Sequence, residues 1–225
     1  MSLALRIESK ERLVRHVCGQ LSMFYPLSVL ENDIHSISLF VEESLSRMAV
    51  IVNSVRNFKQ GYFDHLNTLQ YASFIYILGN TICKSKDNKK LNEDEKSDLV
   101  DRLFGLNRAV SGLEIYPSTS LPEPFFLSHA LGTILGNVQY GRGLVIFHNV
   151  TVGRIGENRP SVGDDVILFP GSSVTGRSTI GAGSVISANT HLHNVHIPEK
   201  SLVFSGNGKI SIKNLDRDYL SLYFR

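Results

Sequence analysis

The residues best suited to chemistry lie in the second half of the chain, where histidines stand singly and in one short cluster. The single histidines are His129 and His148, and the cluster is His191, His193 and His196. A neutral imidazole accepts a proton readily near physiological pH. A well-placed general base contributes on the order of 10²–10⁴ in rate, so proton transfer is the chemistry that a single histidine indicates.

A metal site is the alternative chemistry for the clustered histidines. Together with His148 they offer enough imidazoles for zinc, which histidine binds readily. Alternation along a strand puts His191 and His193 on the same side, which keeps this possibility open. We nevertheless expect no metal and interpret the cluster as solvated side chains, because its spacings of two and three residues form no recognised ligand pattern.

Composition limits the partners that the chain can have. The 225 residues are 42% hydrophobic and carry a net charge of only +2, so nothing indicates a nucleic-acid partner. No apolar run approaches the ~20 residues that span a bilayer, and the N-terminus lacks the apolar stretch of a signal peptide. The two distant cysteines, Cys18 and Cys83, indicate free thiols. We therefore expect a cytoplasmic protein without a membrane span.

The first part of the chain, residues 1–110, is predicted to be a helical domain. Apolar residues recur at helical spacing around residues 13–21 and 41–55, and a third apolar stretch covers 66–82. A fourth helix is expected to begin at Asn92, because Glu95 three residues later completes a capping box. These positions indicate core packing and carry no chemistry of their own.

The second part of the chain repeats every six residues. Aliphatic residues at this interval run without a miss through Val162, Leu168, Val174, Ile180, Ile186 and Leu192. The same spacing occurs earlier, at Ile115, Leu121 and Leu127 and at Val138, Leu144 and Val150, and we predict that these residues belong to the same repeat. Such a repeat indicates a parallel β-helix, in which each coil buries its apolar face by stacking on the next. We assign it to residues 111–212, with a C-terminal tail at 213–225 and a loop ejected at 153–160.

Several segments of this region resemble the serine acetyltransferase branch of the hexapeptide-repeat acyltransferases. They are Glu114-Ile115-Tyr116-Pro117, Leu127-Ser128-His129-Ala130-Leu131-Gly132, Val150-Thr151-Val152-Gly153, Arg159-Pro160 and Val162-Gly163. The resemblance implies an α+β chain whose helical domain precedes a left-handed parallel β-helix. It also implies transfer of an acetyl group from acetyl-CoA to a hydroxyl, with no resident metal.

The resemblance further implies roles for individual residues. His129 occupies the place of the general base, and Glu114 that of the carboxylate which orients it. The resemblance implies a trimer, or a hexamer made of two trimers, in which a groove between adjacent subunits holds acetyl-CoA. The matching cofactor positions are Gly153, Gly171, Ala188 and Lys209.

The acceptor is predicted to differ from that of the family. Ser128 stands where the family has Asp, and Asn158-Arg159 replace its Arg-His pair. With His148 beside them, these residues form the expected acceptor site. Together with the Leu-Pro-Glu-Pro stretch at 121–124, they resemble variants from surface-polysaccharide pathways, so a sugar hydroxyl is the expected acceptor. The alternatives are true serine O-acetylation for cysteine synthesis and, from another class, a zinc hydratase or a non-catalytic trimeric scaffold.

Overall fold

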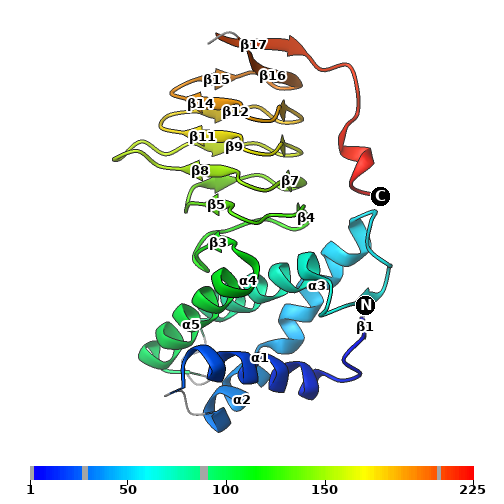
Figure 1. The fold of residues 1–225 in the computed structure, drawn as a ribbon, viewed down its shortest axis with the longest axis vertical. Helices are drawn as coiled ribbons and strands as arrows, with labels where there is room; N and C mark the ends of the chain where they lie inside the picture. The colour runs from blue at the N-terminus through cyan, green and yellow to red at the C-terminus, as the bar shows by residue number, and fades with distance from the viewer. Residues whose placement is uncertain (1–2, 27–29, 87–90, 207–208) are drawn as a thin grey trace.

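The helical half of the protein packs beneath one end of a triangular solenoid (Figure 1). The computed structural model describes residues 3–26, 30–86, 91–206 and 209–225. The helices are α1 (Lys10–Phe24), α2 (Leu30–Ser38), α3 (Val41–Ser54), α4 (Thr68–Lys84) and α5 (Glu93–Ser111), and two short strands, β1 (Ala4–Leu5) and β2 (Tyr62–Phe63), pair beside them. The helices expected around residues 13–21, 41–55, 66–82 and from Asn92 are confirmed.

Two local details of the helices follow from their residues. The predicted capping box is present, because Asn92 Oδ1 accepts from the Glu95 backbone N–H at 2.9 Å and the Glu95 carboxylate accepts from that of Asn92 at 3.2 Å. The short helix α2 was not predicted, although Leu30, Ile34 and Ile37 recur in it at helical spacing. No described helix has both the length and the apolar character needed to cross a membrane.

Three sheets form the sides of the solenoid, and their strands pair in parallel except for the terminal strand β17. Sheet C contains β3 (Glu114–Ile115), β5 (Ile134–Leu135), β8 (Thr151–Gly153), β11 (Ser173–Thr175) and β14 (His191–His193). Sheet D contains β4 (Phe125–Leu127), β7 (Leu144–Ile146), β10 (Ile167–Leu168), β13 (Val185–Ile186), β16 (Ser201–Gly206) and β17 (Lys209–Asn214). Sheet E contains β6 (Gln139–Tyr140), β9 (Ser161–Val162), β12 (Thr179–Ile180) and β15 (His196–Ile197).

The six-residue repeat is confirmed over 162–192, where every predicted position is a buried inward residue of one of the three sheets. The prediction that Val138, Leu144 and Val150 belong to the same six-residue repeat is wrong. The register places Tyr140, Ile146 and Val152 in the interior columns instead. The phase shifts because two connections contain extra residues: the column positions are eight residues apart from Leu127 to Leu135 and ten apart from Val152 to Val162.

Helix α4 joins the two halves. Two of its buried side chains hold the segment between β3 and β4: the Tyr76 hydroxyl donates to the Thr119 carbonyl at 2.7 Å, and the Asn80 amide donates to the Pro117 carbonyl at 2.6 Å. The backbone N–H of Leu121 in turn donates to the Tyr76 hydroxyl at 3.1 Å. The first coil is thus fixed to the helical half.

The C-terminal segment returns to the helical half. After β17, which pairs antiparallel with β16, the chain runs back along sheet D, and Phe224 bridges to Val55. The Arg225 guanidinium donates to backbone carbonyls at the end of α3, including that of Val55 at 2.6 Å. The segment from residue 213 onward is therefore docked on the solenoid and on the helices (Figure 1).

Candidate active site

His129 lies on an enlarged corner of the solenoid, between sheets D and C. Leu127 pairs with Ile146, and the N–H of Asn149 donates to the carbonyl of Leu131 at 3.0 Å. The turn from Leu127 to Leu131 therefore contains two more residues than the corresponding turn of the next coil, which runs from Ile146 to His148. His129 is exposed and has a φ of 52°. The extra residues carry the imidazole outward.

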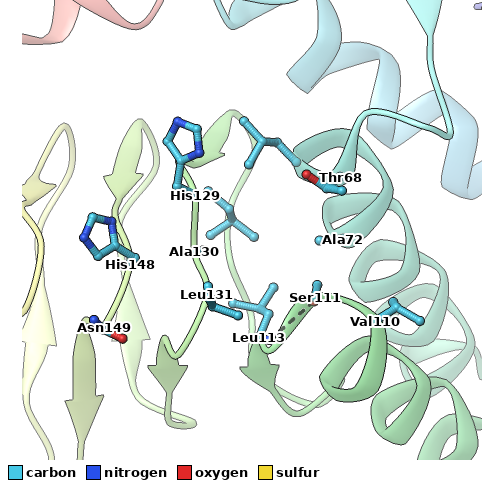
Figure 2. A pocket seen from close by; sticks show the side chains of 12 residues that line it. Thr68, Ala72, Val110, Ser111, Leu113, His129, Ala130, Leu131, His148 and Asn149 are labelled. Atoms are coloured by element: carbon cyan, nitrogen blue, oxygen red, sulfur yellow. Dashed lines mark hydrogen bonds between the residues drawn. The ribbon is translucent and has the colours of Figure 1, made fainter.

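The two single histidines face the same pocket. It has a volume of about 460 Å³ and lies between the solenoid and the helices. Figure 2 shows His129 and His148 on neighbouring coils, with Thr68 and Ala72 of α4 and Val110 and Ser111 of α5 across the gap. Among the described residues, the lining consists of Thr68, Leu69, Ala72, Val110, Ser111, Leu113, Leu127, His129, Ala130, Leu131, His148 and Asn149. This lining contains no Asp, Glu, Lys or Arg side chain.

The helical residues of this pocket were not predicted. Thr68, Leu69 and Ala72 begin α4, and Val110 and Ser111 end α5. Their spacing indicates ordinary helix packing. They reach the pocket through tertiary contacts between segments far apart in the sequence, for which the single sequence contains no signal.

Glu114 does not contact His129 within the described part of the chain. Its carboxylate lies 3.3 Å from the Arg108 guanidinium, its side chain is 40% exposed, and it does not line the pocket. The predicted pair of an imidazole and an orienting carboxylate is therefore not formed in one chain. The reason is topological, because Glu114 belongs to β3 in sheet C, whereas His129 follows β4 in sheet D.

The predicted acceptor residues lie in two places. Ser128 is buried next to His129, and its backbone N–H donates to the carbonyl of Ile146 at 2.7 Å. Asn158 and Arg159 are exposed on the loop between β8 and β9, and Arg159 lines a second pocket of about 330 Å³. That pocket shares no residue with the one that contains His129 and His148.

The predicted cofactor residues are also divided between edges of the solenoid. Gly171 and Ala188 lie on the same edge of the solenoid as His148, one and two coils further along. The N–H of Gly171 donates to the His148 carbonyl at 3.0 Å, and that of Asn189, next to Ala188, donates to the Pro170 carbonyl at 2.9 Å. Gly171 has a φ of 70°, and a Cβ there would lie 2.3 Å from Asn189 Oδ1. Gly153 lies at the far end of β8, and exposed Lys209 begins β17. Residues 207 and 208, part of the predicted final coil, lie outside the described residues.

The histidine cluster lies on the last complete coil and is exposed. A hydroxyl from the coil below lies within hydrogen-bond distance of each Nδ1: Ser173 for His191 at 3.0 Å, Thr175 for His193 at 3.2 Å and Thr179 for His196 at 2.5 Å. Over the described ranges, no three His, Cys, Asp or Glu side chains gather closely enough to hold a metal ion.

Sequence comparison shows similarity to serine acetyltransferases over about half of the chain. The chain is 31% identical over 115 residues to the enzyme of Bacillus subtilis (strain 168), which covers 48% of this chain and 52% of the relative. It is 30% identical over 126 residues to that of Staphylococcus xylosus, which covers 54% and 58%. The chain thus matches about half the length of these curated relatives. No family model matches.

Structural comparison extends the similarity to nearly the whole chain. A serine acetyltransferase from Brucella abortus strain S19 superposes with a TM-score of 0.68 at 18% identity, covering 92% of this chain and 84% of that one. The enzyme of Neisseria gonorrhoeae gives 0.65 at 20% identity, covering 94% and 82%. The Brucella enzyme solved with coenzyme A also gives 0.65, at 16% identity, covering 91% and 82%. The predicted fold, a helical half followed by a left-handed parallel β-helix, and the resemblance to serine acetyltransferases are confirmed.

Proposed function

We propose that the protein is an acetyl-CoA-dependent O-acetyltransferase whose general base is His129. The observation that carries this proposal is the position of His129 on the wall of a pocket, in a chain similar in sequence to serine acetyltransferases over about half of its length. The similarity to a serine acetyltransferase solved with coenzyme A supports acetyl-CoA as co-substrate.

The proposed reaction transfers one acetyl group. The acceptor hydroxyl gives its proton to the neutral His129 imidazole while its oxygen attacks the thioester carbonyl carbon. The carbon–sulfur bond then breaks, and the departing CoA thiolate takes the proton from the imidazolium. The products are an acetyl ester and CoA. His148 lines the same pocket, which makes it the second candidate for contact with the acceptor.

The similarity to serine acetyltransferases favours L-serine as the acceptor, and we propose it as the first candidate. The differences at Ser128, Asn158 and Arg159 favour a sugar instead. Serine carries an ammonium and a carboxylate, and leaving either charge unpaired in a closed site costs several kcal/mol. The described residues that line the pocket supply no Asp, Glu, Lys or Arg side chain. We therefore propose that a second copy of the chain completes the site, in the trimer that the sequence resemblance implies. The trimer, and assembly into a hexamer, stay predictions, as does the cytoplasmic location.

A sugar hydroxyl is the second candidate acceptor. The uncharged lining and the neutral Ser128 next to the base favour it, because a neutral hydroxyl compound needs hydrogen bonds and no ion pair.

An assay of CoA release against a panel of acceptors tests both candidates. We expect L-serine to reach the ordinary enzyme range, with kcat/KM of ~10⁴ M⁻¹s⁻¹ or above, and D-serine and L-alanine to serve as inactive controls. A higher value for nucleotide sugars or free sugars would select the second candidate. No CoA release with any acceptor would refute the acyltransferase proposal. Light scattering that shows a monomer at micromolar concentration would refute the shared site.

A further inference from the structure

The last strand of the solenoid, β17, has one edge that no described strand covers. It lies at the end of the molecule farthest from the helices (Figure 1), and within the described chain it pairs with β16 alone. Sheets C and E end with β14 and β15, which belong to the same coil as β16. β17 therefore forms an extra layer beyond the last complete coil, and its outer edge faces away from the rest of the described residues.

The hydrogen-bond pattern shows which backbone groups face this outer edge. In β16, Val203 directs its backbone groups toward β13, because its carbonyl accepts from the Ser187 N–H at 2.8 Å. Adjacent residues of a strand direct their N–H and C=O groups to opposite sides. Ile212 lies directly opposite Val203, so the two form a non-hydrogen-bonded pair and the backbone groups of Ile212 point away from β16. The same alternation turns those of Ile210 outward, whereas those of Ser211 face β16.

The side chains of β17 alternate along the same edge. Ile210 and Ile212 share the face of the sheet on which Val203 points into the core, but no described coil covers them, and they are 39% and 47% exposed. Lys209 and Lys213 lie on the opposite face and are exposed, and neither ammonium forms an ion pair with a described residue. The outer edge thus presents unpaired backbone groups, two apolar side chains and two positive charges.

The charges disfavour pairing between two copies of this edge. The five residues Lys209–Lys213 have the same order in both directions, Lys-Ile-Ser-Ile-Lys, so two copies could pair antiparallel about a two-fold axis. Such pairing would place Lys209 of each copy directly opposite Lys213 of the other. Like charges directly opposite each other are destabilising, and lysines on an edge strand are a common means of preventing this association. The edge is therefore better suited to a strand of opposite charge.

We propose that the outer edge of β17 binds an extended acidic segment of another protein, which adds a strand to sheet D. In this mode of recognition main-chain hydrogen bonds give affinity and alternate side chains give specificity. In an antiparallel partner, apolar residues lie opposite the two isoleucines and acidic residues opposite the two lysines. The matching pattern is acidic, apolar, any residue, apolar, acidic. This inference does not depend on the proposed enzymatic activity.

Surface plasmon resonance at low ionic strength, with the protein immobilised and capped peptides in solution, tests the proposal. We expect the wild type to bind the peptide Glu-Val-Thr-Val-Glu with a Kd of ~1 mM or below, and Lys-Val-Thr-Val-Lys about tenfold more weakly, which corresponds to ~1.4 kcal/mol. Lys213→Glu should weaken binding of the first peptide by about twofold to fivefold, the effect of one cross-strand charge pair. No binding of the first peptide at several millimolar, or equal binding of both peptides, would overturn the proposal.

Ile212→Pro tests whether the backbone edge itself binds the peptide. Proline lacks the N–H that points away from β16, and it is tolerated in an edge strand on that side, so the pairing with β16 should persist and the melting temperature should change little. Binding of Glu-Val-Thr-Val-Glu should weaken about tenfold through the lost hydrogen bond and the bulk of the ring. The matched control Ile212→Val keeps the N–H and a β-branched side chain and should bind within about twofold of the wild type. Equal binding by the two variants would refute strand addition.

Light scattering distinguishes the proposed partner from a second copy of the chain. We expect the wild type and Ile212→Pro to have the same molar mass at every protein concentration, because pairing between two copies is disfavoured by the lysines. A larger assembly of the wild type that Ile212→Pro abolishes would contradict the proposal and assign the edge to self-association.

Discussion

Replacing His129 by Asn tests the proposed base with little disturbance of the backbone. His129 has a φ of 52°, in the left-handed region, where Asn is among the few residues that are readily accommodated. The side chain is exposed, so the free energy of unfolding should change by no more than about 0.5 kcal/mol. Asn has no group that accepts a proton at neutral pH. We therefore expect kcat to fall by about 10²–10⁴, or ~2.7–5.4 kcal/mol in activation free energy.

The matched control is His148→Asn, on the neighbouring coil of the same pocket. If His148 only lines the pocket, its loss should lower kcat by less than about tenfold, well short of the general-base range. The assay is CoA release at saturating acetyl-CoA, with binding of CoA measured separately by calorimetry. CoA binding should persist in both variants. Near-wild-type turnover in folded His129→Asn, or a larger loss in His148→Asn, would remove His129 from the proposed mechanism.

Three further predictions concern the helical half. Arg102→Met should lower the free energy of unfolding, measured by urea denaturation, by ~3–5 kcal/mol. The reason is that the Asp33 carboxylate, which is 6% exposed, loses its partner at 2.7 Å. The control Asp98→Ala removes a partner that is 67% exposed and should lower the same free energy by at most ~1 kcal/mol. Tyr76→Phe should cost ~1–3 kcal/mol in the same assay, because the hydroxyl makes two hydrogen bonds with the first coil. Burial raises the pKa of the Cys18 thiol from 9.0 to about 12, so the native thiol should resist thiol reagents at pH 8. Since the unfolded thiol ionises first, this group's contribution to stability should be lost as pH rises from 9 toward 12.

The solenoid was predictable wherever its repeat was regular. From Val162 to Leu192 each side of the triangle uses six residues, so spacing alone gives the correct interior positions. Before Val162 the corner at His129 and the β8–β9 hairpin both add residues. An apolar residue then matches the repeat without lying in its columns: Leu144 and Val150 are fully buried, yet Ile146 and Val152 lie in the columns.

The candidate site was predictable only where short motifs mark it. The consecutive residues around His129 resemble a serine acetyltransferase motif, and in the structure His129 and His148 line the same pocket. The pairing of Glu114 with Arg108 was not predictable, because it depends on how α5 meets the first coil. The walls contributed by α4 and α5 were missed for the same reason.

The C-terminal segment determines which sides of the solenoid a second chain can contact. The outward residues Val145, Ile167 and Val185 of sheet D are at most 3% exposed, although outward side chains of a bare solenoid meet solvent. The returning segment covers them, as the ring contact between Phe126 and Tyr223 at 6.2 Å shows near its end. Sheets C and E have no such cover within the described chain, and exposed residues such as the histidine cluster lie on them. A second copy that completes the proposed site must therefore pack against sheet C or sheet E, unless the C-terminal segment detaches first.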